Sequence, residues 1–182
     1  MPEVYLFDFY DRVPKPWKAE ATTTLNGYFK QCATKGVAPL RAWWWSWDPT
    51  PGELDILVFI APKMEEIWKL KYPQKELPDQ SADGFTTWEI GDEVVSTVFP
   101  GPYGGEGYAM LIVHEIMHMK LRMGRDMHSM GGLASSCVSR NCDTPVTGLS
   151  KDNISRMRGA IGKSVKQWSA GPGLVFQKAQ AD

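Results

Sequence analysis

The sequence has no surplus of either charge and no long apolar run, and each absence excludes a class of partner. Its 182 residues carry 20 Lys and Arg against 21 Asp and Glu, so the formal net charge is -1. A nucleic-acid-binding domain needs a basic surplus on one face, and an anionic membrane surface attracts the same kind of patch. No apolar stretch approaches the roughly 18 residues that a bilayer span requires. We therefore expect neither nucleic acid nor membrane as a partner.

Cysteine is also scarce, and no secretory leader is evident. The three cysteines are Cys32, Cys137 and Cys142, and residues 1–8 lack the basic region and unbroken apolar core of a signal peptide. An odd number of cysteines without a leader indicates reduced thiols in a cytoplasmic protein, although a mature secreted or leaderless exported form would look the same. Cys137 and Cys142 form a C-x4-C pair, which is a weak metal signal without two further ligands.

Apolar periodicity predicts an α+β or mixed α/β single domain spanning residues 1–182. The nearly continuous apolar run at 54–61 is typical of a central strand covered on both faces. Within this domain, the sheet and a long helix would occupy residues 1–124. Residues 125–182 would contain an irregular stretch at 125–149 and a final helix. Strands are predicted at 3–9, 40–48, 54–61, 85–90 and 93–99, and helices at 17–35, 63–71, 106–123 and from Ser150 to Gly171.

The strongest chemical signal is the motif His114-Glu115-Ile116-Met117-His118, which has the form H-E-x-x-H. On a helix, residues i and i+4 lie one turn apart on the same face, so both imidazoles can bind one ion. The motif falls on a predicted helix, and the apolar positions of that helix point away from the histidines. The competing interpretation is a pair of partly buried histidines on an ordinary amphipathic helix.

A catalytic zinc needs a third protein ligand and an open position for water. The third histidine of the chain, His128, follows Gly124, which can end the helix and turn the chain back. The intervening residues are long enough to return to the metal. We predict His128 as the third ligand. The alternative is that His128 is a solvent-exposed loop histidine. In that case Asp126, Asp143 or Asp152 would be the third ligand.

The helix that carries His114, Glu115 and His118 resembles the active-site helix of the zincin metallopeptidases. That family has a twisted mixed sheet with a backing helix, an active-site helix and a C-terminal helical subdomain that supplies the third ligand. The resemblance implies Zn²⁺ as cofactor and peptides or proteins as substrate. It also implies hydrolysis by a metal-activated water, with Glu115 as general base and then acid. A non-catalytic, zinc-stabilised structural or interaction module is the alternative function.

The branch of the family is not assigned, because the metzincin signature H-E-x-x-H-x-x-G-x-x-H is not met. Leu121 stands where that pattern has Gly, and Gly124 stands where it has His. The gluzincin pattern uses a downstream Glu as ligand, and no Glu follows Glu115. Met157 could correspond to a methionine turn beneath the metal, but its spacing in the last helix favours a core position.

Several features near the motif have weaker functional interpretations. The strand at 93–99 could be an edge strand that pairs with substrate or an ordinary sheet strand. The segment 101–107 could be a lid or a plain connector. Tyr103 and Tyr108 are candidates for stabilising an oxyanion. The tryptophans at 43–47 are interpreted as packing residues rather than a binding surface.

Overall fold

The computed structural model of the protein describes residues 2–8, 11–36, 39–45, 52–60, 83–87, 94–136, 146 and 148–167. The predicted helix at 63–71 lies outside the described residues, as do Cys137, Cys142 and Asp143. The elements in chain order are β1 (Glu3–Asp8), α1 (Lys15–Gln31), β2 (Arg41–Trp45), β3 (Ile56–Ile60), β4 (Gly84–Thr87), β5 (Val95–Val98), α3 (Gly104–Leu121), the 3-10 helices η1 (Arg125–Met130) and η2 (Gly132–Ala134), and α4 (Lys151–Ala160).

The described strands form one five-stranded sheet in the order β2-β1-β3-β5-β4. β1, β2, β3 and β5 are parallel, and β4 is antiparallel to β5. β3 lies in the middle, and all five of its residues are buried, which confirms the prediction of a central strand covered on both faces. The protein is therefore a mixed α/β fold with a mainly parallel sheet.

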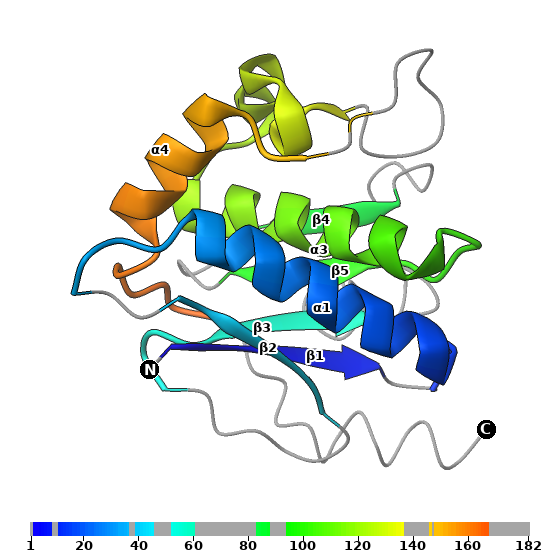
Figure 1. Cartoon of the computed structure of the whole chain (residues 1–182). Helices are drawn as coiled ribbons and strands as arrows, with labels where there is room; N and C mark the ends of the chain where they lie inside the picture. The colour runs from blue at the N-terminus through cyan, green and yellow to red at the C-terminus, as the bar shows by residue number, and fades with distance from the viewer. Residues whose placement is uncertain are drawn as a thin grey trace, which may run out of the picture.

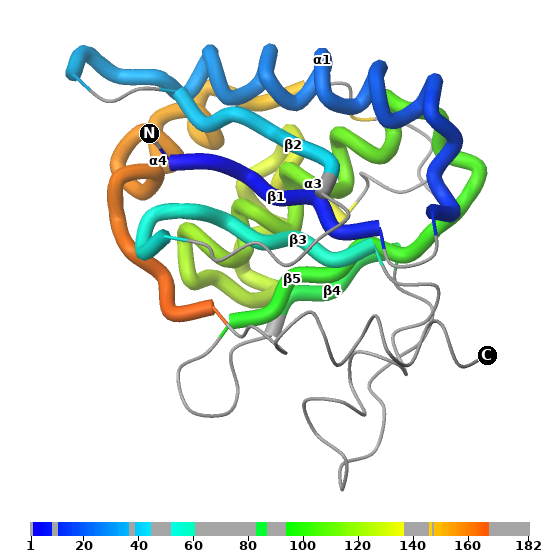
Figure 2. The backbone as a smooth tube through the Cα atoms, turned by 90° about the horizontal axis from the view of Figure 1, so that it is seen from below, coloured from blue at the N-terminus to red at the C-terminus, as the bar shows by residue number. Residues whose placement is uncertain are grey.

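α1 and α3 pack against each other on the same face of this sheet (Figure 1). α1 lies over β2, and α3 lies over β5 and β4, as the rotated view in Figure 2 also shows. Alternate residues of the strands point into the layer between sheet and helices, because side chains of a strand alternate between its two faces. This core includes Val4, Leu6, Ile56, Val58 and Val98 from the sheet and Leu25, Phe29, Ile112 and Ile116 from the helices.

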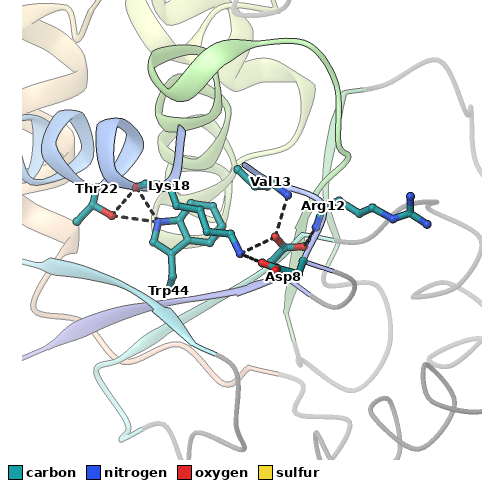
Figure 3. A network of polar contacts seen from close by, with 7 residues as sticks. Asp8, Arg12, Val13, Lys18, Thr22 and Trp44 are labelled. Atoms are coloured by element: carbon teal, nitrogen blue, oxygen red, sulfur yellow. Dashed lines mark hydrogen bonds and ion pairs between the residues drawn. The ribbon is translucent and has the colours of Figure 1, made fainter. Parts of the chain in front are cut away.

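A polar network at the C-terminal end of β1 fixes the position of α1 (Figure 3). The carboxylate of Asp8 accepts from the backbone amides of Arg12 and Val13 at 3.1 and 3.0 Å. It also lies 3.0 Å from Nζ of Lys18. The indole of Trp44 donates to the carbonyl oxygen of Lys18 at 3.0 Å. Trp44 thus packs on α1 as predicted for the tryptophan segment.

A second tryptophan of this segment, Trp43, differs from Trp44. Trp43 is 46% exposed, so the packing prediction is wrong for that residue. It points to the opposite face of β2 because neighbouring strand residues alternate. Trp47 lies outside the described residues.

The predicted strand at 93–99 is confirmed as β5, but it is not an edge strand. β5 lies between β3 and β4, and β4 is the outer strand at this side of the described sheet. Strand order depends on pairing between distant segments, which local patterns do not encode. Any pairing of substrate with an edge near α3 would therefore involve β4.

Three helix ends differ from the prediction. α1 ends at Gln31 rather than at residue 35. α3 ends at Leu121, and its C-cap is Arg122 in the left-handed conformation, rather than a turn at Gly124. α4 begins at the predicted N-cap Ser150, with a capping box to Asn153, but ends at Ala160. The stretch predicted as irregular contains η1 and η2.

None of the helices in the described part of the chain combines the length and apolar character that a bilayer-crossing segment needs.

Candidate metal centre

α3 places the two histidines of the motif on one face, facing the turn that follows the helix. His114 and His118 are one helical turn apart, and their ring centroids are 4.7 Å apart. His114 is 7% exposed, and His118 is half-buried. The rest of α3 is largely buried because it packs against α1 and the sheet. The helix therefore presents the pair at a fixed position rather than in solvent.

His128 completes a group of three imidazoles. Nε2 of His118 lies 3.1 Å from Nε2 of His114 and 3.2 Å from Nε2 of His128. One nitrogen from each of the three rings lies within 4.8 Å of the others. Three nitrogens that share a tetrahedral ion at about 2.0–2.1 Å would lie about 3.3 Å apart. The three histidines are therefore close enough to bind one metal ion.

Backbone carbonyls fix the orientation of the two helical histidines. Nδ1 of His114 lies 2.7 Å from the carbonyl oxygen of Leu133, and Nδ1 of His118 lies 2.7 Å from that of Met123. A carbonyl oxygen only accepts, so each Nδ1 carries the proton and each Nε2 carries a lone pair. Two lone pairs 3.1 Å apart repel each other, and a cation between them removes that repulsion. Histidines that bind metals commonly donate their other ring N–H to a backbone carbonyl in this way.

The protonation states also suit metal binding. Burial, together with the neighbouring His118, lowers the pKa of His114 to about 3. Burial likewise lowers the pKa values of His118 and His128 below the ordinary value of 6.5. All three imidazoles are thus neutral at pH 7, which is the form that binds metal.

The loop that carries His128 is shaped by glycines and anchored by α4. Gly131 and Gly132 have φ values of 65° and 55°, a region that residues with a side chain rarely adopt. A Cβ at Gly132 would also overlap Ser150 and Asn153. The glycine pair therefore lets the chain turn sharply against the start of α4.

The rival ligands are not part of the group in the described residues. No Asp, Glu or Cys among them joins the three histidines. Asp152 instead pairs with Arg156 at 3.0 Å, one turn along α4, and Asp126 is exposed. Met157 is 1% exposed and belongs to the hydrophobic core, as its spacing predicted.

The carboxylate of Glu115 is buried beneath β4. Glu115 is 3% exposed, and its Oε2 accepts from the hydroxyl of Thr86 at 2.5 Å. Burial raises the pKa of Glu115 to about 8, and the hydrogen bond from Thr86 opposes this rise. A cation bound by the adjacent imidazoles would lower that pKa through its charge. Sequence reasoning missed Thr86, because only the pairing of β4 brings it to α3.

The two tyrosines proposed as oxyanion ligands have other partners. The hydroxyl of Tyr108 accepts from the backbone amide of Gly101 at 3.0 Å, and that of Tyr103 donates to Asp83 at 2.7 Å. Tyr108 lies six residues before His114, about 9 Å along the helix axis. These contacts fix the start of α3. The predicted lid segment is accordingly not a free loop, because Gly104 already begins the helix.

Comparison of the chain with protein-family models, with curated proteins and with solved structures gave no match.

Proposed function

We propose that the protein is a zinc-dependent peptidase of the zincin type. The observation that carries the proposal is the convergence of three neutral imidazoles, at 3.1 and 3.2 Å, next to a buried glutamate in an H-E-x-x-H helix. Three converging histidines correspond to the His₃ ligand set found in catalytic zinc sites. The sheet with its outer antiparallel strand and packed helices is compatible with the zincin fold.

His114, His118 and His128 would bind the zinc ion. Zinc in such a site acts as a Lewis acid and lowers the pKa of water towards about 7. The chain's own contribution to the proton transfers is Glu115. Its carboxylate would accept a proton from the attacking water and donate it to the leaving amine. The carbonyls of Leu133 and Met123 keep two of the imidazoles in the tautomer that binds metal.

Metal analysis combined with a peptidase assay tests the proposal. Purified protein is expected to contain about one zinc per chain and to cleave quenched fluorescent casein. Glu115→Gln is expected to keep the zinc and lose hydrolysis, because the amide cannot accept the proton. Glu106→Gln is the matched control, since Glu106 lies exposed on the same helix.

Two results would contradict the proposal. Hydrolysis by Glu115→Gln at the wild-type rate would remove the assigned role of Glu115. Zinc-loaded wild-type protein that cleaves neither casein nor a random peptide library, but unfolds when the metal is chelated, would indicate a zinc-stabilised structural or interaction module.

A further inference from the structure

The carboxylate of Glu115 rests against the inner face of β4. Gly84 and Thr86 are two residues apart, so they share one face of this strand. A Cβ at Gly84 would overlap Oε1 of Glu115, and the Thr86 hydroxyl lies 2.5 Å from Oε2. The strand thus contacts both carboxylate oxygens. Oε1 lies in the space left by the absent side chain of Gly84, and Oε2 accepts a hydrogen bond from Thr86.

A second hydroxyl contacts the first. Oγ of Ser96 on β5 lies 2.8 Å from Oγ1 of Thr86, its register partner on β4. The Thr86 hydroxyl donates to Oε2 of Glu115. The Ser96 hydroxyl has two acceptors within reach, the Thr86 hydroxyl and, at 3.5 Å, the backbone carbonyl oxygen of Glu115. Both residues are held by the pairing of two strands, and Ser96 is completely buried.

We infer that Thr86 is a positioning residue for Glu115, and that Gly84 provides the space in which its carboxylate lies. This inference rests on the proposed hydrolysis for its catalytic consequence, but the geometry itself does not depend on it. With Oε2 bound to Thr86 and Oε1 lying against Gly84, the carboxylate is held in a single orientation. A side chain on a helix is in this way oriented by the outer strand of the described sheet.

The fixed orientation matters because proton transfer depends strongly on distance. A displacement of about 1 Å at a reacting group can lower a rate by about 100-fold. Without the Thr86 hydroxyl, the buried carboxylate has no side-chain donor among its described contacts, so its orientation is less restricted. The predicted effect therefore falls on kcat rather than on substrate binding or metal content.

Three substitutions test the effect of the Thr86 hydroxyl separately from the other properties of the sheet. Thr86→Val removes the hydroxyl at nearly constant volume, and Thr86→Ser keeps it. Thr97→Val is the matched control, because Thr97 is a buried threonine of β5 whose hydroxyl has no partner within the described residues. It lies on the opposite face of β5 from Ser96.

The zinc-loaded variants are compared by kcat, KM and zinc content with quenched fluorescent casein. Thr86→Val is expected to lower kcat about 10- to 100-fold with KM and zinc content unchanged. Thr86→Ser is expected to restore most of the rate, and Thr97→Val to match the wild type. Wild-type kcat in Thr86→Val, or an equal loss in Thr86→Ser, would overturn the inference.

Gly84→Ala provides an independent test if Thr86→Val does not fold. Its added methyl group displaces the carboxylate while the Thr86 hydroxyl remains, so kcat is expected to fall with zinc retained. An unchanged kcat in a folded Gly84→Ala protein would also overturn the inference.

Crystal structures of the zinc-free proteins give a result that does not depend on activity. The Glu115 carboxylate is expected to stay on β4 in the wild type and in Thr86→Ser, and to leave it in Thr86→Val. A carboxylate that stays in place in Thr86→Val would refute the positioning role. If the wild type hydrolyses no peptide, this structural comparison still decides the inference, whereas the proposed function fails.

Discussion

The side-chain amide of Asn153 donates to the carbonyl oxygen of Gly131 at 3.1 Å. Asn153 is completely buried in the first turn of α4, and Gly131 follows η1, which carries His128. The same side chain accepts from the amide of Ser150 at 3.2 Å and so completes the cap of α4. One residue thus joins the start of the last described helix to the loop of the third histidine.

Replacement of Asn153 by Ala is expected to destabilise the protein and to weaken metal binding. It removes one of two hydrogen bonds to the carbonyl of Gly131, which still accepts from the amide of Ala134 at 3.2 Å, and it leaves the amide of Ser150 without its side-chain partner. The expected decrease in unfolding free energy is about 1–3 kcal/mol, the cost of one unpaired buried group, measured by urea denaturation of the zinc-free protein. An effect below about 0.5 kcal/mol would show that this link is unimportant.

His128 is expected to contribute directly to metal affinity, whereas Asp152 is not. His128→Ala removes one of three converging imidazoles. Loss of a residue that only hydrogen-bonds to a ligand typically lowers metal affinity about 10- to 100-fold, and the loss in His128→Ala should be larger. Asp152→Asn should leave affinity unchanged, because Asp152 pairs with Arg156 instead. Competition with a chromophoric chelator measures both. A large loss of zinc affinity in Asp152→Asn would instead indicate that this carboxylate is a ligand.

Arg122→Gly is expected to stabilise the protein. Arg122 has φ 51° and ψ 44° at the end of α3, a conformation that glycine adopts without the strain imposed by a Cβ. The gain in unfolding free energy should be about 0.5–1 kcal/mol, measured by urea denaturation. Arg122→Ala removes the same side chain but keeps the Cβ, so it should show no gain. Equal effects of the two substitutions would contradict the backbone explanation.

Cys32 is expected to make stability fall between about pH 9 and pH 11. The thiol is 3% exposed, and burial raises its pKa from 9.0 to about 11. In this range the unfolded chain releases the proton while the folded protein keeps it, so rising pH favours unfolding. Two pKa units correspond to about 3 kcal/mol. Urea denaturation of wild type and Cys32→Ala under reducing conditions isolates the effect, and parallel pH profiles would disprove it.

Local patterns predicted the parts of the fold that depend on local properties. The apolar run at 54–61 identified the central strand, and Ser150 was correctly placed as the cap of α4 because capping needs only neighbouring residues. The three histidines could be grouped from spacing alone, since two share a helix face and the third follows within a short loop. Their assignment as zinc ligands remains a prediction.

The remaining features depend on contacts between distant segments. Val165 keeps the helical spacing of α4 and is buried, yet it lies beyond the helix end at Ala160. The chain there turns towards the sheet, and the carbonyl of Lys166 accepts from the amide of Val94 at 2.8 Å. Periodicity could not distinguish a buried extended residue from a helical one. The contact between Thr86 and Ser96, and hence the environment of Glu115, could not be predicted either, because it depends on the pairing of β4 with β5.

The anchoring of the His128 loop by Asn153 has a consequence for biosynthesis. During translation, the helix with His114 and His118 leaves the ribosome well before α4 does, because chains emerge from the N-terminus. A nascent chain that ends before Ser150 holds all three imidazoles but lacks Asn153, the residue that secures the loop of the third. Tight cation capture should accordingly be a late event, completed after α4 has been synthesised and docked.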